Sequence, residues 1–200
     1  MERILEHIIS AYNPLCVLVY GSFADGTNGE HSDFDCMIIT GSKTTSHDAS
    51  VVGDVQLDLF IHTMDEVNRI DNYDDFVQIH DAIIVKDVDG IAEKLKLAVQ
   101  SHIVDNSVKS EGEKEHLRAW LKKMLTRAEA NDTEGRYRHH LALIEGLEIY
   151  FVLRDRYYFG PKKAISALAR EDKEAYELFD KAMRNVDYQS LKDWIEWVLG

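Results

Sequence analysis

The sequence predicts an α/β (α+β) protein with a mixed β-sheet in its N-terminal part and a bundle of helices in its C-terminal part. Short apolar runs bounded by turn residues, typical of buried strands, occur in the first hundred residues. From about residue 110 onward the apolar residues instead recur with a period close to 3.6, which is typical of helices. These two patterns place a first domain at residues 1–105 and a helical domain at residues 106–200.

The composition is that of a globular chain. Of the 200 residues, 45% are hydrophobic, 11 are Gly and 2 are Pro, which allows a substantial core and excludes a disordered or fibrous protein. No apolar run reaches the roughly 18 residues that a membrane span needs, and the first residues form an amphipathic pattern rather than a signal peptide. We therefore expect a cytoplasmic protein that has no membrane partner.

The surplus of acidic residues lies in one half of the chain. The formal net charge is −13, and residues 1–100 hold 6 Lys and Arg against 18 Asp and Glu, whereas residues 101–200 hold 17 against 18. A nucleic-acid-binding surface needs grouped basic side chains to contact phosphates, and no dense group is visible. The sequence therefore argues against a nucleic-acid partner and favours a small cationic one.

Four strands are expected in the first domain. They are residues 15–20, 34–39, 51–61 and 82–85. Residues 15–20 are a continuous apolar run, as in a buried strand, whereas 51–61 alternates apolar and polar residues, as a strand with one buried face does. Cys16 and Cys36 lie inside apolar runs, where cysteines commonly pack as free thiols, so neither a disulfide framework nor a zinc cluster is expected. The polar segment 41–50 is expected to be a loop.

Helices are expected around these strands and throughout the second domain. Those of the first domain are residues 2–11, 64–70 and 91–103. Asp89 is expected to cap the last of them, and the polar stretch 104–113 to link the domains. In the second domain apolar stripes predict two long helices, Pro161 begins a third, and residues 187–199 form a short helix at the end. Three or four antiparallel helices fit this pattern.

The turn-rich segment that begins at Gly21 carries the residues of most chemical interest. Gly21 follows a strand and would allow a tight turn and a close approach of the backbone to a ligand. Ser22 is expected to cap a short helix, residues 23–25, that ends at Gly26. The free N–H groups of such a helix would point at a phosphate.

Three carboxylates follow this turn. Asp33 and Asp35 are two residues apart, so in a strand both point to one face, about 6.6 Å apart along the backbone, and can converge on a metal ion. Asp58 projects from the more polar face of a later strand. Three converging carboxylates would repel one another unless divalent cations neutralise them, and paired cations are a known device for phosphoryl-type transfer.

Each of these pieces alone has a simpler explanation. A Gly-Ser pair is usually a turn, an Asp-x-Asp at a strand end is usually solvated, and Asp58 alone is equally well explained as a salt-bridge partner. The complete order is more restrictive: a strand, Gly-Ser, a ten-residue loop, Asp-x-Asp, a second strand, and an acid between apolar residues in a later strand.

The segment from Gly21-Ser22 to Asp33-Phe34-Asp35, with Asp58, resembles the motif of the DNA polymerase beta-type nucleotidyltransferase superfamily. A compact catalytic domain followed by a helical domain is also similar to the small antibiotic nucleotidyltransferases of the aminoglycoside and lincosamide type. The resemblance implies that Gly21 and Ser22 bind a nucleoside triphosphate and that Asp33 and Asp35 bind one or two Mg²⁺ ions. It further implies that Asp58 is a third metal ligand or the general base.

The function implied by the resemblance is transfer of a nucleoside monophosphate to a hydroxyl group, with release of pyrophosphate. The donor would be ATP, which supplies AMP, or another NTP. The acidic surplus favours a cationic small-molecule acceptor such as an antibiotic over tRNA. A protein acceptor and a homodimer remain open. The alternative from another class is an antitoxin-like or nucleotide-binding module that acts through a helical partner protein.

The chain departs from the family pattern at two positions. Many relatives carry Arg or Lys one and three residues after the serine, where this chain has Phe23 and Asp25. A basic contact to the triphosphate would then come from elsewhere, for which the candidates are Lys43, Arg136, Arg138, Lys162 and Lys163. A further base could come from Glu111, Glu113, Glu115, Glu145 or Glu148.

Other motifs are better explained by local structure. The segment from Asp87 to Gly90 ends a strand and precedes a helix, so it reads as a turn and cap. His47-Asp48 and His80-Asp81 are expected to be loop residues. Arg138-His139-His140 is expected to lie on a helix surface or to contain a buried histidine.

Overall fold

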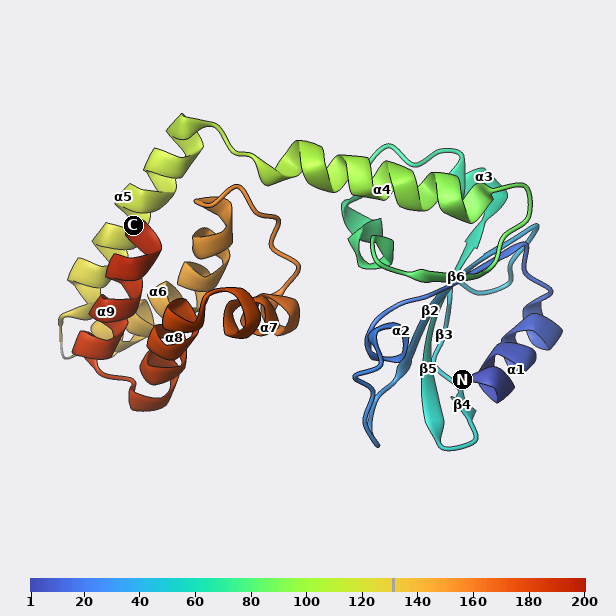
Figure 1. Ribbon diagram of the computed structural model, residues 1–200, viewed down its shortest axis with the longest axis horizontal. Helices are drawn as coiled ribbons and strands as arrows, with labels where there is room; N and C mark the ends of the chain where they lie inside the picture. Colours follow the sequence, from blue (N-terminus) through green and yellow to red (C-terminus); the bar gives the residue numbers. More distant parts are fainter. Residues whose placement is uncertain (131) are drawn as a thin grey trace. The chain divides into compact units, whose positions relative to one another are not determined.

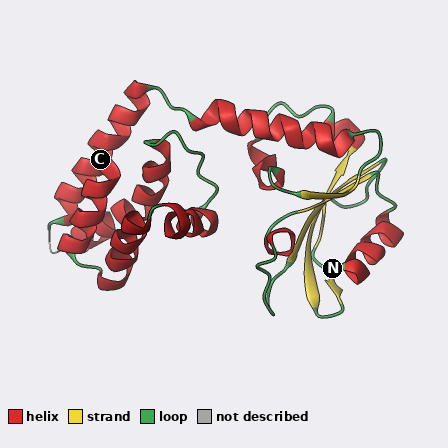
Figure 2. Ribbon diagram, in the orientation of Figure 1, coloured by secondary structure: helices red, strands yellow, loops and turns green. Residues whose placement is uncertain are grey.

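The computed structural model describes residues 1–130 and 132–200 and divides into two compact units, Met1–Ile103 and Val104–Gly200 (Figure 1). The first unit combines a mixed β-sheet with helices, and the second is helical (Figure 2). The predicted fold class is therefore confirmed. The division falls within α4 (Ile91–Ser107), and α5 begins at Glu111, so the expected linker 104–113 is largely helical.

A mixed sheet organises the first unit. Its strands are β1 (Cys16–Val19), β2 (Phe34–Thr40), β3 (His47–Asp48), β4 (Val51–Val52), β5 (Val55–Thr63) and β6 (Ile83–Lys86). The strand order is β3-β5-β2-β1-β6, and β4 pairs with β5 outside this path. Only the β2–β5 pair is parallel among the pairings of the described residues, which makes the sheet mixed. The parallel pair brings two acidic residues that are far apart in sequence into register.

One face of the sheet packs against α1 (Glu2–Tyr12). This face consists of Val17, Val19, Phe34, Cys36, Ile38, Leu57, Leu59 and Ile61. Ile4 and Ile8 of the amphipathic α1 complete the cluster, and each stabilises the unit by about 2 kcal/mol through burial. Because side chains alternate along a strand, the residues between these, including Asp35 and Asp58, lie on the opposite face.

The predicted strand at 51–61 is two strands. Val52 pairs with Val55, so β4 and β5 form a hairpin closed by Gly53 and Asp54. Gly53 has φ +70°, the left-handed conformation that tight hairpin turns require. The expected loop 41–50 also contains a strand, the two-residue β3, which is too short to produce a periodic pattern.

The helices of the first unit differ from the predictions at their ends. The predicted helix 64–70 is the single turn α3 (Met64–Val67), and the 3₁₀ helix η1 (Asp74–Ile79) was not predicted. Asp87, not Asp89, caps α4, because its two carboxylate oxygens accept the N–H groups of Ala92 (2.9 Å) and Glu93 (3.2 Å). Asp89 instead occupies the left-handed turn, with φ +57°.

Glu66 stabilises the start of α3 through two contacts. Its carboxylate lies 2.7 Å from Lys43 Nζ and accepts the Thr63 N–H at 2.8 Å. These contacts, the Lys43 hydrogen bond first, lower the pKa of Glu66 from 4.5 to about 2. Because the folded-state pKa is the lower one, the stabilisation is complete above about pH 4.5 and is lost as the pH falls towards 2.

We therefore expect Glu66→Gln to lower the free energy of unfolding by about 1 kcal/mol at pH 7, a modest value because the Glu66 side chain is 45% exposed. At pH 3 the difference in the free energy of unfolding between the variant and the wild-type protein should be less than half of its value at pH 7. Urea unfolding at both pH values measures it. A difference that does not change with pH would contradict the assignment.

The second unit is a bundle around a single apolar core. Its helices are α5 (Glu111–Ala128), α6 (Thr133–Val152), α7 (Pro161–Glu171), α8 (Lys173–Asn185) and α9 (Tyr188–Leu199). Trp194 is fully buried and contacts the rings of Tyr150 and Phe179 at centroid distances of 5.9 and 5.2 Å. The described residues from Glu111 onward thus form five helices, where three or four were predicted. The extra helix arises at Asp172, whose carboxylate accepts the Ala175 N–H at 3.0 Å and starts α8 directly after α7.

The structure confirms the predicted start of α7, the predicted buried face of α9 and the predicted state of the two cysteines. Pro161 is the first residue of α7, and α9 buries the predicted apolar residues, including Leu191 and Trp194. Cys16 and Cys36 are buried free thiols. Among the described helices, none has the length and apolar character needed to cross a lipid bilayer.

Candidate functional site

A row of polar residues crosses one face of the sheet near the beginning of β2. The parallel β2–β5 register places Asp35 directly beside Asp58. On the other side of β2, the backbone N–H of Tyr20 donates to the carbonyl of Asp35 at 3.1 Å, so Tyr20 stands opposite Asp35. Because directly opposed residues of neighbouring strands point to the same face, these three side chains share one surface of the sheet.

Gly21 brings the Gly-Ser turn against Asp35. Its φ is +65° and its ψ −153°, and a Cβ atom at this position would lie 2.2 Å from Oδ2 of Asp35. A side chain there would be strained by the positive φ and would have to displace the Asp35 carboxylate, so both the backbone conformation and the nearby carboxylate favour glycine. The turn and the Asp35 carboxylate are therefore in direct contact.

Ser22 was predicted to cap a short helix, but it is not the N-cap residue of that helix. It is the first residue of α2 (Ser22–Asp25), and the N-cap position is occupied by Gly21, which has no side chain to cap the helix. The residue is buried, with 5% of its surface exposed. The predicted end of this helix is confirmed, because Gly26 adopts the left-handed conformation with φ +76°.

The three predicted carboxylates are not equivalent. Asp35 and Asp58 lie side by side within β2 and β5, whereas Asp33 is an exposed residue just before β2. Within residues 1–130 and 132–200, no group of three or more His, Cys, Asp or Glu side chains is arranged to hold a metal ion. The structure thus brings two of the three together. That pair still fits Mg²⁺, which typically takes one or two carboxylates and completes its octahedron with water and substrate phosphates.

His47 is a site residue that the sequence reasoning missed. The predicted loop residue lies on β3, and its Nε2 is 2.7 Å from Oδ1 of Asp58. Since an ionised carboxylate can only accept hydrogen bonds, the proton is on Nε2. A two-residue strand leaves no periodic signal, and the contact spans eleven residues of sequence, so no local pattern could have revealed it.

Tyr20 is a second residue that the motif did not indicate. Its hydroxyl is buried and lies near the side chain of Gln78. Burial, followed by the charges of Asp58 and Asp35, raises the pKa of this hydroxyl, and the neighbouring Gln78 has a smaller opposite effect. The hydroxyl therefore stays protonated and presents a donor near two carboxylates.

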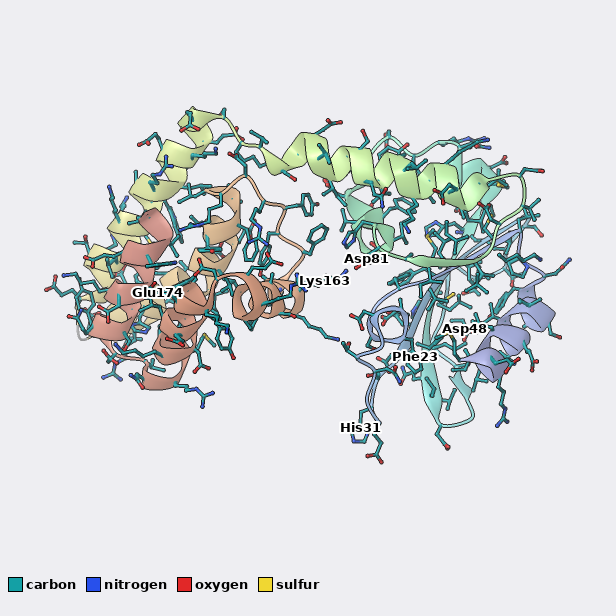
Figure 3. All side chains as sticks on the ribbon, viewed as in Figure 1. Phe23, His31, Asp48, Asp81, Lys163 and Glu174 are labelled. Atoms are coloured by element: carbon teal, nitrogen blue, oxygen red, sulfur yellow. The ribbon has the colours of Figure 1, made fainter. Side chains whose placement is uncertain are left out.

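The structure accounts for the two departures from the family pattern. Phe23, which Figure 3 labels, is half-buried and packs against the apolar cluster of the sheet. Its ring lies 5.2 Å from that of Phe34. Asp25 caps the following turn, because its Oδ1 accepts the backbone N–H of Thr27 at 2.9 Å and the Thr27 hydroxyl at 2.6 Å. Both side chains thus have structural roles.

The candidate basic residues have varied surroundings. Lys43 binds Glu66 and the carbonyl of Ile61, further along β5 than Asp58. Arg138 forms an ion pair with Glu134 at 3.1 Å. Lys162 and Lys163 lie in the first turn of α7.

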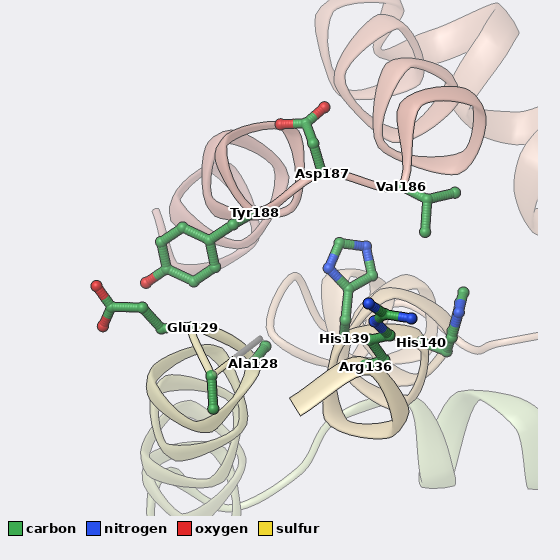
Figure 4. A pocket seen from close by; sticks show the side chains of 9 residues that line it. Ala128, Glu129, Arg136, His139, His140, Val186, Asp187 and Tyr188 are labelled. Atoms are coloured by element: carbon green, nitrogen blue, oxygen red, sulfur yellow. The ribbon is translucent and has the colours of Figure 1, made fainter. Parts of the chain in front are cut away.

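Arg136 lines a cavity of about 470 Å³ in the second unit. Figure 4 shows His139 at its centre, with Arg136 and His140 on the same helix. His139 is the buried histidine of the predicted pair, and burial followed by His140 lowers its pKa.

The candidate bases of the second unit divide into two groups. Glu113 caps α5 through Ser110, Glu111 pairs with Lys114, and Glu115 pairs with Arg118. Glu145 and Glu148 instead line a cavity of about 260 Å³ together with His116 and Trp120. Burial and the neighbouring Glu145 raise the pKa of Glu148. These two carboxylates are thus the candidates that face a cavity.

Residues 1–125 match the model of a family described as the nucleotidyltransferase domain, so the chain belongs to this nucleotidyltransferase family. Among solved structures, a nucleotidyltransferase-like protein from Exiguobacterium sibiricum 255-15 is similar, with 14% identity and a TM-score of 0.46. The similarity covers 100% of this chain and 74% of that one. The comparison with curated proteins gives no match.

Proposed function

We propose that this protein is a metal-dependent nucleotidyltransferase that moves a nucleoside monophosphate, AMP from ATP, to a hydroxyl group of a small-molecule acceptor. Membership of the nucleotidyltransferase family supports transfer in general. The observation that carries the proposal is the pairing of Asp35 with Asp58 on adjacent strands, with Asp35 against Gly21. Two like charges side by side cost stability, and a site that binds a cation explains why both are present.

Each site residue has a distinct role in this proposal. Asp35 and Asp58 would hold Mg²⁺, and Asp33, which is exposed just before β2, would be the third carboxylate available to the ion. The ion, when bound, neutralises negative charge on the triphosphate and on the departing pyrophosphate. The backbone of Gly21 and Ser22 contacts the phosphates, since glycine lets the chain come close to a ligand.

The reaction is an in-line displacement at the α-phosphorus. The oxygen of the acceptor hydroxyl forms a bond to the α-phosphorus, and the bond from that phosphorus to the oxygen bridging to the β-phosphate breaks. Pyrophosphate leaves with the electrons of the broken bond. The hydroxyl proton passes to a carboxylate, for which Asp58 is the candidate in the first unit.

The acceptor that best suits this chain is a hydroxylated small molecule with positive charge. The first hundred residues, which contain the paired aspartates, carry almost all of the net charge of −13. A negative field attracts cationic ligands and repels nucleic acids. This chemistry agrees with the resemblance to nucleotidyltransferases of the aminoglycoside and lincosamide type, and an antibiotic is therefore a suitable first acceptor.

Release of pyrophosphate tests the proposal. The protein is incubated with Mg²⁺, each of the four NTPs, and a panel of cationic and neutral hydroxylated acceptors. We expect acceptor-dependent release that Asp35→Asn abolishes and Asp54→Asn, the same change in the exposed β4–β5 turn, leaves unchanged. Nucleotide binding without any release would instead favour the alternative, a nucleotide-binding or antitoxin-like module.

A further inference from the structure

We propose that His47 is a positioning residue for Asp58: it holds Oδ1 of the carboxylate, so that Oδ2 alone faces the metal ion or the acceptor hydroxyl. This inference rests on the proposed function, because it assigns a role within the same site. It starts from the 2.7 Å contact between His47 Nε2 and Asp58 Oδ1. The motif of Gly-Ser, Asp-x-Asp and a third acid does not include this histidine.

The backbone of β3 is fixed on both sides of His47. His47 pairs with Phe60 and Asp48 with Leu59 in the antiparallel ladder to β5. The ladder is extended by a hydrogen bond from Ile61 N–H to the carbonyl of Ser46 at 2.9 Å. The histidine therefore projects from a strand that is hydrogen-bonded to the same strand that carries Asp58.

A contact to α1 anchors the residue next to His47. The hydroxyl of Tyr12 donates to Oδ2 of Asp48 at 2.6 Å, and the N–H of Ser50 donates to Oδ1 at 2.8 Å. Burial and the hydrogen bond to Asp48 raise the pKa of Tyr12 to about 12, so the donor is present throughout the physiological range. Both oxygens of Asp48 thus have partners, which holds β3 in place beside His47.

The imidazole ring is held by packing as well as by its hydrogen bond. Its centroid lies 4.9 Å from that of Phe60, with 44° between the planes. Phe60 shares the sheet face with Asp58, two residues along β5. The ring therefore packs on Phe60 with Nε2 towards the carboxylate.

Stability does not explain this contact. The side chains of His47 and Asp58 are 41% and 40% exposed, and ion pairs with such exposure contribute about 0–1 kcal/mol. The contact is better explained as a means of orienting the Asp58 carboxylate. A carboxylate that is already held in place does not lose conformational entropy when the reaction occurs. A carboxylate with one oxygen committed to His47 also binds a metal through one oxygen rather than two.

The test compares His47→Leu with His47→Gln. Leucine keeps an apolar contact to Phe60 and removes the donor, whereas glutamine retains an N–H donor at a similar reach. We expect His47→Leu to weaken Mn²⁺ binding about 10-fold and to lower kcat about 10–100-fold, with a small change in the KM for ATP. His47→Gln should stay within about threefold of the wild-type protein, and so should His7→Leu on the exposed face of α1.

Mn²⁺ binding, measured by electron paramagnetic resonance without nucleotide, separates this inference from the proposed function. The wild-type protein could release no pyrophosphate while His47→Leu still weakens Mn²⁺ binding relative to His47→Gln. In that case the proposed transfer activity is wrong, and the positioning role of His47 is supported. Equal Mn²⁺ affinity and kcat in His47→Leu and the wild-type protein would overturn the inference. Equal losses in both His47 variants, or no Mn²⁺ binding by the wild-type protein, would overturn it as well.

Discussion

Asp35→Asn should lower the rate of nucleotide transfer by at least about 10³-fold, which corresponds to roughly 4 kcal/mol of transition-state stabilisation. The asparagine keeps the size of the side chain but removes the charge that would hold Mg²⁺. Asp35 lies between the Gly21 turn and Asp58, so no other described carboxylate occupies the same place. Pyrophosphate release at saturating ATP and acceptor, compared between variant and wild-type protein, measures the loss.

The same variant should keep its fold. Like charges that lie directly opposite in a sheet repel each other, and Asp35→Asn removes one of the two in the Asp35–Asp58 pair. We therefore expect a melting temperature no lower than that of the wild-type protein. Full transfer activity in Asp35→Asn would refute the assignment, and a large fall in melting temperature would mean that the carboxylate serves the fold instead.

Gly21→Ala should impair both folding and activity. The added Cβ would lie 2.2 Å from Oδ2 of Asp35, at a backbone φ of +65° that L residues rarely adopt. Strained backbone of this kind costs about 1–3 kcal/mol, and the clash must also move the Asp35 carboxylate. We expect the free energy of unfolding to fall by about 3 kcal/mol and the transfer rate to fall about 100-fold.

Gly26→Ala is the matched control for this prediction. Gly26 also has a positive φ, +76°, but an added Cβ there would meet nothing within 4 Å. It should therefore cost roughly 1 kcal/mol of stability through backbone strain and leave the transfer rate nearly unchanged. Urea unfolding and pyrophosphate release measure both variants. Equal effects of the two substitutions on activity would show that the contact between Gly21 and Asp35 has no functional role.

The parts of the site that depend on local pattern were predictable from the sequence. The alternation in residues 55–61 separates Asp58 from the buried Leu57 and Leu59, as the structure confirms. The φ of Gly21 and the left-handed Gly26 likewise follow from the demand for a tight turn. These features involve neighbours in the chain, where sterics and periodicity determine the outcome.

The pairing between distant segments was not predictable in the same way. The sequence does not show that β2 and β5 are parallel, and this pairing alone sets Asp35 beside Asp58. The contact of His47 with Asp58 depends on a two-residue strand, and the cap of α4 depends on which of two nearby aspartates takes the left-handed turn. Such choices are made by tertiary packing, which overrides weak local preferences.

The helical unit illustrates a similar limit. The apolar stripes revealed the long helices α5 and α6, but the break between α7 and α8 rests on a single residue. Asp172 accepts an N–H of α8 and also the hydroxyl of Tyr150 at 2.5 Å, so a contact from α6 helps to set the boundary. A pattern read along one segment does not contain that information.

A crystal structure of the protein with Mg²⁺ and a non-hydrolysable ATP analogue tests the central claim most directly. We expect the triphosphate to lie against the backbone of Gly21 and Ser22, with a metal ion about 2.0–2.1 Å from a carboxylate oxygen of Asp35 and close to Oδ2 of Asp58. Nucleotide bound elsewhere on the chain, or bound at Gly21 with no metal ion at Asp35, would contradict the claim.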